Sequence, residues 1–282
     1  MFERTIEITA IQRLCLYDGP GVRTTVFLRG CYLDCPWCCN PETKSNGIQY
    51  YYYPEKCWYD KKDNNNIPAI CNGCKKIHIL ECPYGVYESI SIMLDADALF
   101  ERIIRDRDFW GKVGGVTFSG GEPLMQSEAL CPLVKRLKEN GVHITMETSL
   151  YAPNDKLLKI EPYIDMFIVD VKMLNKPFVL KHYKDEKLDF TTNIHQLSDK
   201  GKIGILRMVL IDKLTVTPEN IIQLEQLTEK IKFGNLEFLE YHALGNKKAE
   251  RMGLTSVQFE KPNEITMKSV TEKFVNCKNL KT

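Results

Sequence analysis

The sequence predicts an α/β fold in which six parallel strands form an open, partial (β/α)6 barrel. Six apolar segments read as buried strands, and they span residues 25–28, 114–118, 143–148, 166–172, 203–210 and 236–242. Helix-sized segments separate them, and nearly continuous apolar strands covered by helices are typical of a parallel sheet. Six such units fit a partial barrel better than the closed, eight-stranded form.

Several connecting segments carry signals for helices. A helix from Asp95 is indicated by apolar residues at helical spacing and by acidic residues in the first turn. The segment 126–140 ends before Gly141, a residue typical of helix ends, and the segment 219–232 follows Pro218. One last helix is expected at about residues 262–275.

Residues 47–93 interrupt the barrel pattern. They contain a polar run at 60–66 with too little apolar content to pack. We therefore expect two units, a barrel of residues 1–46 and 94–282 and a small cysteine-rich insert of residues 47–93 after the first strand. The cysteines of the insert are Cys57, Cys71, Cys74 and Cys82.

The four insert cysteines match two kinds of metal site. Cys71 and Cys74 are two residues apart and Pro83 follows Cys82, as in parts of a ferredoxin module. The seven residues between Cys74 and Cys82 exceed ordinary ferredoxin spacing, and four thiolates suit zinc equally well. The insert is therefore expected to hold one second [4Fe–4S] cluster or a structural zinc.

Charge and composition exclude several classes of protein. With 38 Lys and Arg against 37 Asp and Glu, the chain has no electrostatic footprint for nucleic acid or an anionic membrane. No apolar run approaches the roughly 18 residues of a membrane span, and the first residues do not resemble a secretory signal. Eleven cysteines are an odd number for a disulfide framework, so we expect metal ligands and buried thiols, the latter including Cys131 and Cys277. We expect a cytoplasmic monomer.

Three cysteines follow the first predicted strand at short spacing. Cys31, Cys35 and Cys38 are separated by three and then two residues. A [4Fe–4S] cluster is normally held by four thiolates, so three thiolates leave one iron open, as in a catalytic metal site. A zinc knuckle or a disulfide staple fits less well, because zinc sites usually pair two CxxC units and no histidine lies nearby. An open cluster is sensitive to oxygen, which implies a reducing and anaerobic setting.

Polar residues recur where the other predicted strands end. Gly120 and Gly121 allow close backbone approach, and Glu122 can pair with a ligand ammonium. Five strands with polar groups on one rim are not readily explained by solubility alone. The further residues on this rim are Glu147 with Thr148, Asp170 with Lys172, Arg207, and His242. Before the first strand, Asp18, Gly19, Pro20 and Gly21 form a tight-turn sequence, which on its own predicts only a hairpin turn.

Taken together, these motifs resemble the radical S-adenosylmethionine superfamily. The match includes the cysteine triplet and the Gly-Gly-Glu sequence at 120–122. Asp18–Gly21, the Asn-Pro-Glu sequence at 40–42 and the segment 241–253 are similar to the glycyl-radical-enzyme activating enzymes, of which pyruvate formate-lyase activase is the best known. Cys39 stands where that family usually has histidine, and Glu147 where it usually has aspartate.

The resemblance implies a role for each motif. Cys31, Cys35 and Cys38 would hold the [4Fe–4S] cluster, whose open iron binds S-adenosylmethionine. The Gly-Gly-Glu sequence would hold the amino group of that ligand, Lys172 its carboxylate, and His242 would lie near its ribose. Arg207 matches the arginine of the fifth strand. Glu147, Thr148 and Asp170 would hold a monovalent cation, and Asp18–Gly21 would receive the target peptide.

The implied activity is reductive cleavage of S-adenosylmethionine. An electron from a flavodoxin or ferredoxin would release a 5′-deoxyadenosyl radical, which would abstract a Cα hydrogen from one glycine of a partner glycyl radical enzyme. That glycine lies in an Arg-Val-X-Gly-Tyr type of segment in such partners. Two alternatives stay open: a radical enzyme that modifies a small molecule or ribosomal peptide directly, and a non-catalytic iron–sulfur electron carrier. The electron carrier would not need Glu122, Lys172 and His242 on one rim.

Overall fold

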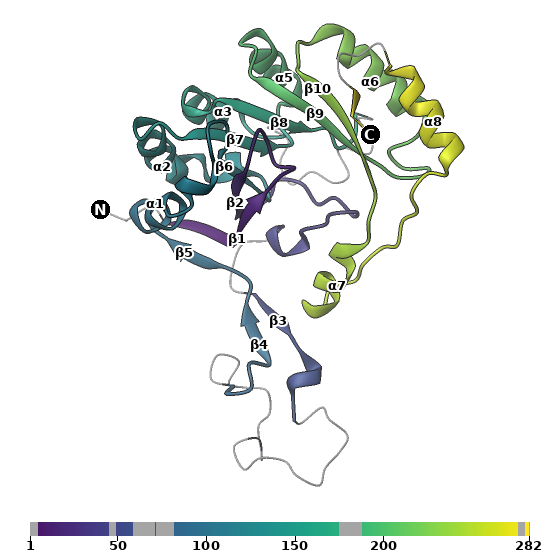
Figure 1. Ribbon diagram of the computed structural model, residues 1–282. Helices are drawn as coiled ribbons and strands as arrows, with labels where there is room; N and C mark the ends of the chain where they lie inside the picture. Colours follow the sequence, from purple (N-terminus) through teal and green to yellow (C-terminus); the bar gives the residue numbers. More distant parts are fainter. Residues whose placement is uncertain are drawn as a thin grey trace.

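The computed structural model describes residues 5–44, 49–58, 71, 82–174, 188–275 and 280–281. Its centre is a sheet of nine strands within this described part (Figure 1). In sheet order the strands are β11 (Leu280–Lys281), β10 (Asn235–Glu240), β9 (Ile203–Leu210), β8 (Met166–Asp170), β7 (His143–Thr148), β6 (Gly115–Gly120), β2 (Arg23–Leu28), β1 (Ile6–Cys15) and β5 (Ile92–Leu94).

The six predicted strands are confirmed as neighbouring, parallel strands. They are β2, β6, β7, β8, β9 and β10, and each pairs in parallel with the next. Their ends differ from the prediction by a few residues; the fourth strand, for example, ends at Asp170. Because all six run in the same direction, their carboxyl ends share one rim, and the predicted site residues are spread along it.

Two antiparallel strands were not predicted. β1 pairs antiparallel with β2, and β5 pairs antiparallel with β1 at the edge of the sheet. Polar and apolar residues alternate at the start of β1, and Ile6 and Ile8 are buried while Glu7 is partly exposed. That pattern is typical of a strand with one buried face. The turn between β1 and β2 contains Asp18–Gly21, so the local prediction of a hairpin turn agrees with the structure.

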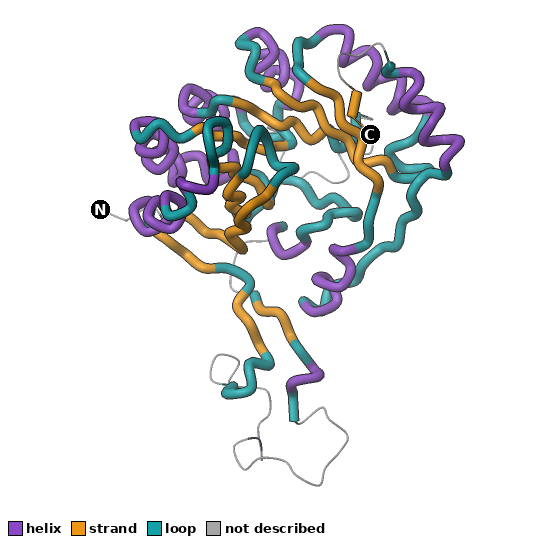
Figure 2. Tube along the Cα trace, in the orientation of Figure 1, coloured by secondary structure: helices purple, strands orange, loops and turns teal. Residues whose placement is uncertain are grey.

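Helices cover the outer face of the sheet (Figure 2). They are α1 (Ala96–Ile104), α2 (Ser127–Glu139), α3 (Asn154–Ile160), α5 (Phe190–Asp199), α6 (Pro218–Lys230) and α8 (Glu264–Lys273), whereas α7 (Leu244–Arg251) lies apart from them, beside β3 (Figure 1). The predicted helix starts are visible as caps: Asp95 accepts a hydrogen bond from the Ala98 amide at 2.6 Å. Leu130, Leu133 and Leu137 of α2 are fully buried, so one face of the helix packs into the core.

The stem of the insert is a separate two-stranded sheet. β3 (Tyr50–Tyr52) and β4 (Tyr87–Ser89) pair antiparallel and project from the barrel (Figure 1). Cys57 and Cys71 are buried and Cys82 is partly buried, whereas Cys74 lies outside the described residues. Cys131 is only partly buried, which corrects the prediction of a buried thiol, and Cys277 lies outside the described residues. In the described part of the chain, no helix is long and apolar enough to cross a membrane.

Candidate functional site

The cysteine triplet lies on a loop between β2 and the short 3₁₀ helix η1 (Pro41–Thr43). The loop closes on itself, because the Gly30 amide donates to the Thr43 carbonyl at 2.8 Å. The Cys38 amide donates to the Cys35 carbonyl at 3.2 Å, and Lys44 Nζ donates to the same carbonyl at 2.6 Å. These bonds hold the loop that carries the three thiols over the carboxyl end of the barrel.

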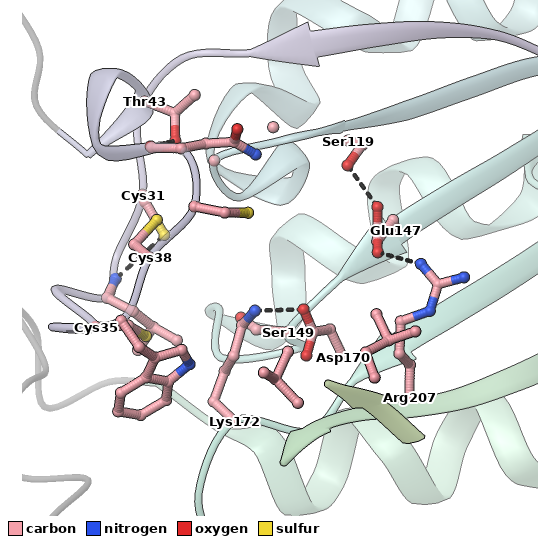
Figure 3. A pocket seen from close by; sticks show the side chains of 18 of the residues that line it. Cys31, Cys35, Cys38, Thr43, Ser119, Glu147, Ser149, Asp170, Lys172 and Arg207 are labelled. Carbon is pink, nitrogen blue, oxygen red and sulfur yellow. Dashed lines mark hydrogen bonds and ion pairs between the residues drawn. The ribbon is translucent and has the colours of Figure 1, made fainter. Parts of the chain in front are cut away.

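The three cysteines and most of the predicted rim residues line one cavity of about 430 Å³ (Figure 3). A volume of this size is typical of a small-molecule site. The predicted residues that line it are Asp18, Cys31, Cys35, Cys38, Gly120, Gly121, Glu147, Thr148, Asp170, Lys172, Arg207 and His242. Gly19, Pro20, Gly21 and Glu122 do not line it.

The three thiols have the chemistry of metal ligands. Among the described residues, no three His, Cys, Asp or Glu side chains are arranged to hold a single metal ion. A [4Fe–4S] cluster differs from a single ion, because each thiolate binds its own iron. Burial raises the pKa of Cys31 to about 12 and raises the pKa values of Cys35 and Cys38. A bound cation reverses this effect, because a coordinating thiol loses its proton outright, and the donor set therefore fits an iron–sulfur cluster.

Glycines bring the rim close to the cysteine loop. Gly120 has a φ of +104°, and a Cβ there would lie 2.5 Å from backbone atoms of Leu28. A Cβ on Gly121 would lie 2.1 Å from the Gly30 carbonyl oxygen. Only glycine allows these two backbones to approach so closely.

Glu122 is held by hydrogen bonds within the protein. Its side chain is fully buried, and its carboxylate accepts hydrogen bonds from Thr148 Oγ1 at 2.6 Å and from Ser149 Oγ and N at 2.7 and 3.0 Å. The Leu124 amide adds a fourth bond at 3.2 Å. These bonds fasten the loop after β6 to the end of β7, and the expected contact of Glu122 with a ligand ammonium stays a prediction.

Glu147 and Arg207 form an ion pair in the wall of the cavity. Glu147 Oε1 accepts from Arg207 Nη1 at 2.7 Å, and Oε2 accepts from Ser119 Oγ at 2.6 Å (Figure 3). Arg207 also donates to Glu237 at 3.0 Å. Burial opposes the charge on Glu147, but the Arg207 cation, the Ser119 hydrogen bond and the Lys172 cation together outweigh it, so the pKa of Glu147 is lowered. Each oxygen of Glu147 accepts one bond from a protein donor and can accept another, so the monovalent-cation site that the resemblance implied stays a prediction.

Asp170 and Lys172 form the second ion pair of the cavity (Figure 3). Burial alone would lower the pKa of Lys172, but the Asp170 carboxylate together with Cys35 and Cys38 reverses this and raises it. Asp170 Oδ2 accepts from Lys172 Nζ, whereas Oδ1 is buried and has no hydrogen-bond partner in the described part of the chain. A buried acceptor without a partner is costly, so this oxygen marks a place for a donor from a ligand.

The Asp18–Gly21 turn folds against the inside of the barrel. Asp18 Oδ2 accepts from Thr25 Oγ1 at 2.6 Å, and its backbone carbonyl accepts from Thr117 Oγ1 at 2.7 Å. Arg207 Nη2 donates to the carbonyl of Tyr17, the residue before the turn, at 2.8 Å. Tyr17 itself is 86% exposed. Arg207 therefore connects the cavity wall with this turn.

Sequence reasoning missed several residues of the site. Trp37 and Leu33 line the cavity beside the cysteines, and Ser119 holds Glu147. The position of Trp37 between two predicted ligands was the available signal. Arg23 is fully buried and donates to Thr117 Oγ1 at 3.0 Å inside the barrel, a role that only the three-dimensional contacts reveal.

Comparisons with known proteins identify relatives over most of the chain. The family described as 4Fe-4S single cluster domain matches residues 17–196. The 4-hydroxyphenylacetate decarboxylase activating enzyme of Clostridioides difficile is 31% identical over 269 residues, covering 86% of this chain and 84% of that protein. The pyruvate formate-lyase 2-activating enzyme of Escherichia coli (strain K12) is 32% identical over 269 residues, covering 93% and 88%.

Solved structures support the same fold. The crystal structure of QueE from Escherichia coli has a TM-score of 0.52 at 13% identity, covering 98% of this chain and 92% of that one. SuiB of Streptococcus suis, solved with its precursor peptide SuiA, has a TM-score of 0.54 at 12% identity, covering 89% and 46%. These two likenesses concern the fold alone. From its sequence relatives, the chain belongs to the radical S-adenosylmethionine superfamily and, within it, to the glycyl-radical-enzyme activating enzymes.

Proposed function

We propose that this protein cleaves S-adenosylmethionine reductively and activates a partner glycyl radical enzyme. One electron breaks the S–C5′ bond and gives methionine and a 5′-deoxyadenosyl radical. That radical takes a hydrogen atom from the Cα of one glycine of the partner, which leaves 5′-deoxyadenosine and a glycyl radical. The observation that carries the proposal is the single cavity that contains the three cysteine thiols and both ion pairs.

Cys31, Cys35 and Cys38 would hold a [4Fe–4S] cluster and leave one iron without a thiolate. Bound there, the cluster supplies the electron for cleavage and an open coordination position for the amino and carboxylate groups of S-adenosylmethionine. In the protein, Lys172 provides a cation for the ligand carboxylate, and the free Asp170 Oδ1 accepts from a ligand donor. Gly120 and Gly121 allow the ligand to approach the backbone, and His242 is an exposed wall residue beyond the end of β10.

The cavity also has to keep the radical from stray hydrogen donors and water. Leu33, Trp37, Val209 and Leu239 form apolar parts of its wall. A primary carbon radical abstracts hydrogen from many C–H bonds, so the reacting groups must be held close and dry. Apolar wall residues exclude water, while the two ion pairs orient the polar end of the ligand.

The partner and the electron donor complete the proposal. The glycine segment of the partner would lie beside Asp18–Gly21, whose first residue lines the cavity. A flavodoxin or ferredoxin would supply the electron, and the protein would act as a cytoplasmic monomer under anaerobic conditions. Residues 47–93 would form a separate unit that holds a second [4Fe–4S] cluster or a zinc ion on Cys57, Cys71, Cys74 and Cys82.

The test is isotope transfer to 5′-deoxyadenosine. The cluster-loaded protein is reduced with dithionite and incubated with S-adenosylmethionine and a synthetic peptide that contains an Arg-Val-X-Gly-Tyr segment with Cα-dideuterated glycine. We expect deuterium in 5′-deoxyadenosine by mass spectrometry and, with the same peptide carrying ordinary glycine, a glycyl doublet in the electron paramagnetic resonance spectrum. A peptide with alanine in place of the glycine is the matched control.

The result distinguishes the proposed activity from the alternative activities. Absence of 5′-deoxyadenosine under any reducing condition would refute the proposal. Formation of 5′-deoxyadenosine without deuterium, repeated with whole glycyl radical enzymes as partners, would instead favour direct modification of a small molecule or a ribosomal peptide.

A further inference from the structure

Helix α7 packs directly against the cysteine loop, although the two lie about 200 residues apart in sequence. Gly245 provides the closest contact: a Cβ at this position would lie 2.3 Å from the carbonyl oxygen of Cys38 and 3.0 Å from the Cα of Cys39. Any larger residue would push the helix away from the loop. The position of the third cysteine is therefore tied to the position of α7.

Lys248 makes the polar part of this contact. Its Nζ donates to Asn40 Oδ1 at 2.9 Å and to Glu42 Oε1 at 2.5 Å. The Glu42 side chain is only 8% exposed, and its other oxygen, Oε2, is buried without a hydrogen-bond partner in the described part of the chain. Among the described residues, Lys248 forms the ion pair that balances the charge of Glu42.

The same helix reaches the stem of the insert. The guanidinium of Arg251 lies 4.8 Å from the centroid of the Tyr53 ring, which follows β3. Figure 1 shows α7 beside β3, away from the helices that cover the sheet. Helix α7 thus contacts both the cysteine loop and the stem of the insert.

We propose that Lys248 is a positioning residue for the cluster: through Asn40 and Glu42 it holds the cysteine loop in place and sets the reduction potential of the bound cluster. The inference rests on the proposed function for the presence of the cluster. Net charge and hydrogen bonds near a cluster set its potential. If Lys248 is lost, the carboxylate of Glu42 stays near the cluster without a counter-ion. Adding an electron then becomes harder, so the potential falls.

The test is a redox titration of the cluster-loaded protein without S-adenosylmethionine, followed by electron paramagnetic resonance. For Lys248→Met we expect the equilibrium constant for reduction by a fixed donor to fall at least threefold, about 28 mV for a one-electron couple at 59 mV per tenfold. Lys247→Met is the matched control, because Lys247 is exposed and its loss changes the net charge equally. Solvent screens an exposed charge, so this control should leave the potential unchanged.

Two further variants distinguish the effect of the lost charge from an effect on folding or cluster loading. Lys248→Arg keeps the cation and should restore the potential. The double variant Glu42→Gln/Lys248→Met removes both charges and should return the potential close to that of the unaltered protein, even if Lys248→Met alone loads its cluster poorly. An equal shift in the Lys247 and Lys248 variants, or a shift in neither, would overturn the inference.

The outcome also distinguishes this inference from the proposed function. If the unaltered protein holds a cluster and cleaves S-adenosylmethionine but Lys248→Met has an unchanged potential, only the positioning role is refuted. If the unaltered protein holds no cluster after reconstitution, the proposed function and the positioning role are refuted together.

Discussion

Replacing Arg207 with methionine is expected to destabilise the protein strongly. The change removes the cation between two carboxylates, because Arg207 donates to Glu147 at 2.7 Å and to Glu237 at 3.0 Å. The side chains of Arg207, Glu147 and Glu237 are only 8, 20 and 14% exposed. Removing one partner of a buried ion pair costs about 3–5 kcal/mol, since it leaves an uncompensated charge. We expect a loss in this range.

The stability that Arg207→Met loses should depend on pH and should become smaller on acidification. In the unaltered protein, the pKa of Glu147 is lowered, so the ion pair contributes stability above the pKa of an unfolded glutamate and loses it as the pH falls through the lower, folded value. Without Arg207, we expect burial, the largest single influence on Glu147, to raise its pKa above that of the unfolded chain. The penalty is then present at neutral pH and shrinks as the carboxylate takes up a proton. The difference between the two proteins should therefore decrease from pH 7.5 to pH 5.

The assay is urea unfolding of the cluster-loaded proteins under anaerobic conditions, followed by circular dichroism at both pH values. Arg136→Met is the matched control, because Arg136 also bridges two carboxylates, those of Asp97 and Glu101, at an exposed site. Exposed pairs contribute little, so this control should lose no more than about 1.5 kcal/mol, stacking on Phe100 included. A loss for Arg207→Met as small as that of the control, or one that does not decrease on acidification, would refute the reasoning.

Three further predictions concern the same cavity. If Glu147, Thr148 and Asp170 hold a monovalent cation, replacing all alkali cations with tetramethylammonium should weaken S-adenosylmethionine binding at least tenfold by calorimetry, because Asp170 Oδ1 is buried and has no hydrogen-bond partner in the described part of the chain; a change of less than twofold would contradict this site. Gly121→Ala should lower cluster content at least fivefold by iron analysis, because its Cβ would lie 2.1 Å from the Gly30 oxygen, and unchanged iron content would argue against it. Glu122→Gln should cost about 1–3 kcal/mol in urea unfolding, because the amide nitrogen cannot accept from Thr148 or Ser149; a neutral result would show that those donors find other partners.

The strands were predictable because a strand that is buried on both faces is almost entirely apolar in sequence. Segments such as 203–210 are almost entirely apolar, and the order of six such segments predicts parallel neighbours. β1 and β5 carry a weaker signal: β5 has three residues, and most of its side chains are exposed. Their pairing depends on the register of β1 against two strands that lie far apart in sequence, which no local pattern contains.

The candidate site was predictable in its members but not in its contacts. Strand ends place Glu147, Asp170 and Arg207 on one rim, and the cavity confirms that they lie together. Which carboxylate meets which cation depends on side-chain length and on the spacing of neighbouring strands. Glu122 shows the limit most clearly, because its donors come from the last residue of β7 and the residue after it, 26 and 27 residues away.

The paired charges beside the cavity are complementary in sign to the ligand. Glu147, Glu237 and Asp170 contribute three negative charges and Arg207 and Lys172 two positive charges, which leaves a net charge of −1 for this group. S-adenosylmethionine carries a sulfonium, an ammonium and a carboxylate, and therefore a net charge of +1. An oxidised [4Fe–4S] core held by three thiolates would add a further negative charge beside these side chains. The side chains and the cluster would therefore both attract the ligand cation, and their combined negative charge is compatible with a monovalent cation beside Asp170, whose Oδ1 has no hydrogen-bond partner in the described part of the chain.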